Sequence, residues 1–155
     1  MNLTKANIKD LRKVTVKIES SNNSEGSGTI VSVEGTLYVL TAAHIIKDET
    51  KDGPLDKGDI VVTLMRNSQK YTLAVDEVVY YNKPEEGDAT VLRVKKLDGM
   101  PTSGFDRVRL LTTDIPGQAV LCGFHKGDTS LKIHNVVKRG EKIGQVQIFN
   151  FNFRT

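Results

Sequence analysis

The chain has 155 residues, of which 38% are hydrophobic and 26% are charged, so one globular domain of ordinary composition is the starting expectation. Its 22 basic and 19 acidic residues leave a net charge of +3, which is too small to favour nucleic acid as a partner. No apolar run approaches the roughly 20 residues of a membrane-spanning helix, which argues against a membrane protein.

The N-terminal segment and the cysteine content predict a cytoplasmic protein. Residues 1–13 mix charged and polar side chains and contain no apolar core of the kind found in signal peptides. Cys122 is the one cysteine, so no intrachain disulfide can form, which is typical of a reducing compartment. Ile8 and Leu11 fall on one helical face, and a short helix is therefore predicted within residues 1–13.

The pattern changes at residue 14 to the two-residue period of β-strands. Val14, Val16 and Ile18 alternate with polar residues, and further strand patterns cover residues 29–33, 36–41, 60–65, 71–75, 78–81 and 89–94. The sequence GSG at residues 26–28 is interpreted as a turn, and Glu34-Gly35 is typical of a tight hairpin. Short strands separated by turn signals about every 8 to 12 residues predict an all-β barrel or sandwich.

A second group of strand patterns follows a segment with several turn-forming residues. Gly99, Pro101 and Gly104 make residues 97–106 a predicted linker. Beyond it, strand patterns cover residues 108–111, 119–124, 131–137 and 144–153. The last pattern stops at Arg154-Thr155 without a closing turn, so we expect it either to pair within its own barrel or to continue in a longer natural chain.

Two motifs contain residues suited to acid–base chemistry. The sequence LTAAH ends a predicted strand at His44, where small preceding residues leave the imidazole room to face a cleft. Asp88 follows in the sequence GDATVL, at the start of another predicted strand. A histidine base that is oriented by a buried aspartate is the arrangement that activates a serine hydroxyl for attack on a carbonyl.

Together with GSG at residues 26–28 and GQAVLCGF at residues 117–124, these motifs resemble in order and spacing the trypsin-like (chymotrypsin-fold) serine protease family, in its bacterial, disulfide-free form. The resemblance implies an all-β double β-barrel with the active site between the barrels. Residues 14–96 would form a complete six-stranded first barrel, residues 97–106 the linker, and residues 107–155 an incomplete second barrel. It also implies a serine endopeptidase that hydrolyses polypeptide substrates without a cofactor, with His44 as general base and Asp88 as the residue that orients it.

The nucleophile of this family is missing from the sequence. The family carries its serine in a glycine-rich loop of the G-D-S-G-G type, whose backbone amides build the oxyanion hole. Ser103 follows Asp88 too closely to be that serine, and the sequence GDTS at residues 127–130 lacks the glycines that should follow. The serine is therefore expected beyond Thr155, in further sequence or domains of the parent protein, and this chain alone is predicted to be inactive.

Other candidate residues carry weaker signals. Cys122 could be the nucleophile of a chymotrypsin-like cysteine protease, but it lies in an apolar strand pattern, where a free cysteine is usually a small buried hydrophobe. Ser27 could also be a nucleophile, although the turn interpretation is favoured. The basic residues between His125 and Lys142 are more typical of a solvated face than of a nucleic-acid surface. Three histidines and one cysteine are too widely spaced to predict a metal site.

Two alternatives to a protease fragment remain open from the sequence. A catalytically dead relative would keep the fold as a binding or regulatory module and lose the nucleophile. The missing strands and serine could also come from a second chain after a proteolytic cut. The retention of both His44 and Asp88 favours the protease, because no structural role obviously requires the pair.

Overall fold

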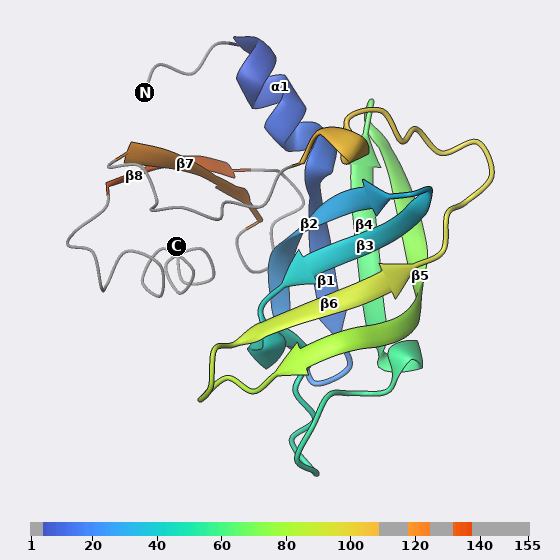
Figure 1. Ribbon diagram of the computed structural model, residues 1–155, viewed down its shortest axis with the longest axis vertical. Coiled ribbons are helices and arrows are strands. Elements are labelled where there is room, and N and C mark those ends of the chain that lie inside the picture. The colour runs from blue at the N-terminus through green and yellow to red at the C-terminus, as the bar shows by residue number, and fades with distance from the viewer. Residues whose placement is uncertain (1–4, 109–117, 125–131, 138–155) are drawn as a thin grey trace.

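The computed structural model describes residues 5–108, 118–124 and 132–137, and its main feature is a closed antiparallel barrel (Figure 1). The six strands are β1 (Thr15–Ser20), β2 (Glu25–Val33), β3 (Thr36–Thr41), β4 (Ile60–Arg66), β5 (Gln69–Asn82) and β6 (Ala89–Val94). Their order around the barrel is β1-β2-β3-β6-β5-β4, and β4 closes it by pairing with β1. The all-β barrel that the sequence predicts is thereby confirmed.

The connections form a Greek key. Strands β1, β2 and β3 are consecutive hairpins, and β4 returns to lie beside β1. Glu34 and Gly35 join β2 to β3 with φ values of 51° and 83°, as a two-residue hairpin with right-handed strand twist requires. Antiparallel pairing of β3 with β6 places Thr41 opposite Thr90, so the residues that follow β3 and precede β6 meet at one end of the barrel.

Strand β5 differs from the prediction of two separate strands at 71–75 and 78–81. It is one strand of 14 residues whose pairing with β6 shifts register between Val75 and Glu77 and again between Val78 and Tyr80. Each shift inserts one extra residue, Asp76 or Val79, which interrupts the alternation of inward and outward side chains. The interruption made the sequence pattern look like two strands separated by a loop. The bulges bend β5 around the barrel and bring its end at Asn82 to the same end of the barrel as Thr41.

The sequence GSG at residues 26–28 also differs from its prediction, because it lies inside β2 and is not a turn. Gly28 faces the barrel interior, where an added Cβ would lie 2.8 Å from Cδ1 of Ile18 and 2.9 Å from Cγ1 of Val39. Both contacts are closer than carbon atoms tolerate, so packing inside the barrel explains this glycine.

The barrel interior is an apolar core closed at both ends. Eight side chains from the six strands are at most 1% exposed: Val16, Ile18, Ile30, Val39, Val62, Leu64, Leu73 and Leu92. The 3-10 turn Ala43–Ile46 covers one end with Ile45 and Ile46, and Figure 1 shows the 3-10 turn Phe105–Arg107 at the opposite end. Phe105 is fully buried there, so part of the segment interpreted as a linker packs into the core.

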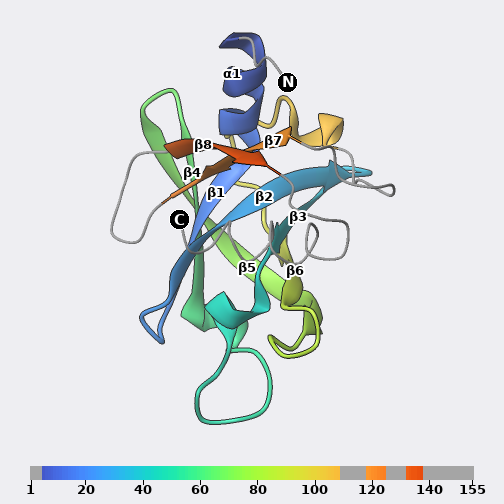
Figure 2. The same cartoon turned by 90° about the vertical axis from the view of Figure 1, so that its left-hand side faces the viewer.

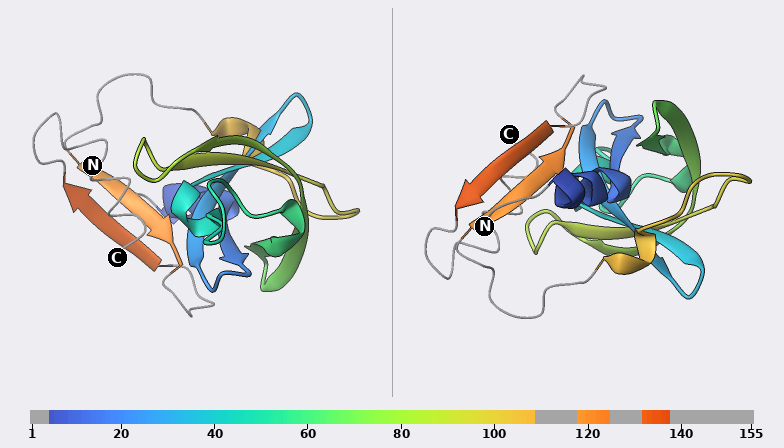
Figure 3. Two further views of the ribbon diagram at one scale, coloured as in Figure 1. Left: turned by 90° about the horizontal axis from the view of Figure 1, so that it is seen from below. Right: turned by 90° about the horizontal axis from the view of Figure 1, so that it is seen from above.

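Two further elements lie outside the barrel. Helix α1 (Lys5–Val14) precedes β1, which extends the predicted N-terminal helix over Val14, a residue expected in a strand. Strands β7 (Gln118–Gly123) and β8 (Lys132–Val137) form an antiparallel two-stranded sheet beside β1 and β2 (Figures 2 and 3). The strand predicted at 108–111, except for its first residue, and the strand predicted at 144–153 lie outside the described residues. No helix in the described ranges is long and apolar enough to cross a membrane.

Candidate functional site

His44 is held at one end of the barrel by a turn that buries its neighbours. Strand β3 ends at Thr41, and the chain enters the 3-10 turn through Ala42 and Ala43, which are both fully buried. Ile45 and Ile46, directly after the histidine, are also fully buried and anchor the turn in the core. The imidazole is thus presented on a rigid support, with 43% of its side-chain surface exposed.

Asp88 reaches the same place from the loop between β5 and β6. The loop is closed by the amides of Glu86 and Asp88, which both donate to the carbonyl oxygen of Lys83, at 2.8 and 3.0 Å. Asp88 adopts a left-handed backbone with a φ of 56°, a conformation that aspartate tolerates better than most residues. This strained turn aims the carboxylate toward β3, and only 12% of the Asp88 side chain is exposed.

The carboxylate of Asp88 holds His44 at two points. Its Oδ2 lies 2.7 Å from Nδ1 of the imidazole, and its Oδ1 accepts the backbone N–H of His44 at 2.8 Å. A carboxylate only accepts hydrogen bonds, so Nδ1 carries a proton and Nε2 is the ring nitrogen able to receive one. The structure therefore brings together the two residues that the sequence singled out for acid–base chemistry.

The three alternative nucleophiles are elsewhere. Ser103 accepts a hydrogen bond of 2.6 Å from the guanidinium of Arg66, the last residue of β4. Ser27 accepts the backbone N–H of Phe124 at 2.6 Å. Cys122 pairs with Ile133 between β7 and β8. The residues 127–130 lie outside the described part of the chain.

Two loops beside the pair are tied together by a contact that the sequence did not suggest. The Nζ of Lys83, in the loop that precedes Asp88, lies 2.7 Å from Oδ2 of Asp52, in the loop that follows His44. This ion pair raises the pKa of Lys83, chiefly through its hydrogen bond to Asp52. Because the side chains of Lys83 and Asp52 are 43% and 76% exposed, the pair adds little stability, and its main effect is to connect the two loops.

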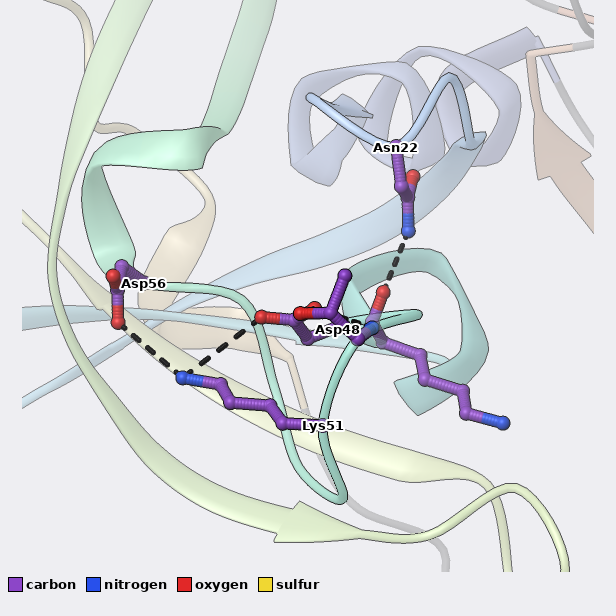
Figure 4. A network of polar contacts seen from close by, with 6 residues as sticks. Asn22, Asp48, Lys51 and Asp56 are labelled. Atoms are coloured by element: carbon purple, nitrogen blue, oxygen red, sulfur yellow. Dashed lines mark hydrogen bonds and ion pairs between the residues drawn. The ribbon is translucent and has the colours of Figure 1, made fainter.

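The loop that follows His44 is itself closed by polar contacts (Figure 4). The backbone N–H and the hydroxyl of Thr50 both donate to Oδ1 of Asp48, which lowers the pKa of that carboxyl. Lys51 lies within 3.9 Å of Asp48 and 3.7 Å of Asp56, and Asn22 donates to the carbonyl oxygen of Lys47 at 2.7 Å. A surface cavity of about 660 Å³ lies against this loop, lined by residues 51–57 and 76–78, and it includes neither His44 nor Asp88.

Over residues 5–108 and the described parts of β7 and β8, no group of three or more histidine, cysteine, aspartate or glutamate residues could hold an ion.

Tyr81, near the end of β5, has a pKa that depends on its burial and on the carboxylates near His44 and Asp88. Burial raises the pKa of its phenol, and the carboxylates of Glu85, Asp52 and Asp88 raise it further, while Lys83 lowers it. The free energy of unfolding is therefore expected to fall as the pH rises above about 10, because the unfolded chain loses the Tyr81 proton before the folded chain does.

We expect Tyr81→Phe to remove the component of the tyrosinate absorbance titration that appears at the highest pH, and to flatten the alkaline loss of stability. Tyr38→Phe, at a half-buried tyrosine of β3, is the matched control and should leave that component in place. The assignment is wrong if the two variants titrate alike.

In comparisons with known proteins, no protein-family model and no curated protein matches the chain.

Proposed function

We propose that this chain supplies the histidine and aspartate of a trypsin-like serine endopeptidase. The observation that supports it best is the two-point contact between Asp88 and His44, through Nδ1 of the ring and through the backbone N–H. A surface histidine that merely forms an ion pair needs only the first contact. The second fixes the carboxylate against the backbone of the base, so the ring keeps one orientation and one tautomer.

In the proposed reaction, Nε2 of His44 takes the proton from a serine hydroxyl while that oxygen attacks the carbonyl carbon of a peptide bond. His44 then gives the proton to the leaving amine. In the second half of the reaction, the same nitrogen deprotonates a water molecule that attacks the acyl-enzyme, and it returns this proton to the serine oxygen as the ester bond breaks. Asp88 stays ionised throughout and stabilises the imidazolium that forms after each proton transfer.

The serine and the oxyanion hole are not recognisable in these 155 residues. A further segment or a second chain would supply both. The β7–β8 sheet would be the first part of the second barrel. Its position supports this, because β7 packs against β1 and β2, next to the strand that leads to His44. The cleft for a polypeptide substrate would then lie between the two units.

A fluorophosphonate probe tests the proposal on the protein translated from the complete gene. The probe forms a covalent adduct with an activated serine, so we expect one adduct on the wild-type protein. His44→Ala should lose the adduct, because the serine then has no base. His134→Ala, which removes a histidine from β8, is the control and should keep it. A wild-type protein without any adduct would contradict the proposal and favour a binding module.

A further inference from the structure

Ser27 joins two parts of the chain that are 97 residues apart. It lies in β2, with its side chain on the outer surface of the barrel, and yet the residue is only 9% exposed. Its Oγ accepts the backbone N–H of Phe124 at 2.6 Å, and the carbonyl oxygen of Phe124 lies 3.5 Å from the same hydroxyl. The end of β7 is therefore hydrogen-bonded to the barrel through the Ser27 hydroxyl.

Gly123 makes this contact possible. A Cβ added to Gly123 would lie 2.9 Å from Oγ of Ser27 and 3.2 Å from its Cβ, closer than such atoms normally approach. A side chain at residue 123 would thus push the end of β7 away from β2. Serine on one strand and glycine on the other form a complementary pair, and a change in either is expected to affect the other.

The backbone of Ser27 is bonded to the strand that carries the histidine. The hydroxyl of Thr41 donates to the carbonyl oxygen of Ser27 at 2.9 Å. Thr41 is the last residue of β3, three positions before His44, and it is only 4% exposed. Ser27 therefore contacts the His44 strand through its carbonyl group and the β7–β8 sheet through its hydroxyl.

We propose that Ser27 is a positioning residue, which fixes the β7–β8 sheet at a set place relative to His44. The inference rests on the function proposed above, because it treats that sheet as the wall of the cleft opposite the histidine. A displacement of about 1 Å between catalytic groups can cost about 100-fold in rate, so an anchor between the β7–β8 sheet and the strand that leads to His44 is expected to have a kinetic effect beyond its effect on stability.

Hydrogen exchange of the Phe124 amide in the 155-residue chain tests the anchor. Ser27→Ala removes the acceptor, so we expect that amide to exchange at least about tenfold faster, while amides in β4 and β5 keep their rates. Ser32→Ala, a half-buried serine on the same strand, should leave Phe124 unchanged. Equal exchange at Phe124 in wild type and Ser27→Ala would overturn the proposal.

Gly123→Ala provides a second route if Ser27→Ala raises exchange throughout the barrel. It leaves every barrel residue in place, and we expect faster exchange at Phe124 alone. The added methyl group should also speed exchange less in a Ser27→Ala background, where the clashing oxygen is gone. Additive effects of the two changes would overturn the proposed pairing.

The positioning role has its own measurement in the complete protein. Ser27→Ala should slow the fluorophosphonate reaction about tenfold or more, with the downfield Nδ1 proton resonance of His44 unchanged, because the His44–Asp88 contact does not involve Ser27. An unchanged reaction rate would contradict the positioning role while leaving the protease proposal intact. Failure of the wild-type protein to react would instead contradict the protease proposal and, with it, the positioning role.

Discussion

Asp88→Asn is expected to lower peptide hydrolysis by the complete protein by about 10⁴-fold, the effect of this change in serine protease triads. Asparagine keeps the shape of the side chain and tolerates the left-handed backbone at residue 88. Its amide nitrogen, however, can donate to Nδ1 of His44, which moves the ring proton to Nε2 and removes the base. The rate of cleavage of a peptide substrate at saturating concentration measures the loss.

Asp52→Asn is the matched control, because it changes a nearby carboxylate that pairs with Lys83 and makes no described contact with His44. We expect its hydrolysis rate to stay within a few-fold of wild type, since an exposed ion pair contributes little. Equal rates for Asp88→Asn and Asp52→Asn would show that Asp88 has no special role in the reaction.

Phe105→Ala is expected to cost about 3 to 5 kcal/mol of unfolding free energy, the usual range for a buried phenylalanine. The ring is fully buried at the end of the barrel, and the guanidinium of Arg66 lies 5.8 Å from its centre. Arg66 is itself buried, with Nη1 lacking a hydrogen-bond partner, so losing the ring also removes a favourable contact of a costly buried charge. Urea unfolding of the 155-residue chain measures the loss.

Leu97→Ala serves as the control from the same segment. Leu97 is 38% exposed, and its truncation should change the free energy of unfolding by about 0.5 kcal/mol or less. If Phe105→Ala cost no more than Leu97→Ala, residues 97–106 would be a loose linker, as their glycine and proline content suggests, and Phe105 would not close the barrel.

The strands were predictable where local patterns decide them. Alternating side chains in β1 and β3 and the Glu34-Gly35 turn specify their hairpins within a few residues of sequence. Strand β5 was not predictable as one element, because its two bulges break the alternation of side chains. The bulges form through pairing with β6, a separate strand that the local sequence pattern of β5 does not reveal. The burial of Phe105 likewise depends on residues far away in the sequence, because its ring joins the core that the barrel strands form.

The candidate site was likewise predictable only in part. The motifs around His44 and Asp88 identified both residues, since each is marked by its immediate neighbours. The contact of Asp88 with the backbone N–H of His44 depends on the closed turn at residues 83–88, whose geometry no motif encodes. The roles of Ser27 and Gly123 were missed for a related reason. The hydrogen bond between Ser27 and Phe124 joins residues that are 97 positions apart, and a GSG sequence more often marks a turn.

Proton NMR of the ¹⁵N-labelled 155-residue chain tests most directly whether His44 and Asp88 form an acid–base pair. We expect a downfield ring-proton resonance, coupled to a histidine nitrogen, that is lost in His44→Gln and altered in Asp88→Asn while Asp52→Asn retains it. A wild-type spectrum without this resonance, or one that Asp88→Asn leaves unchanged, would contradict the pairing on which the proposed function depends.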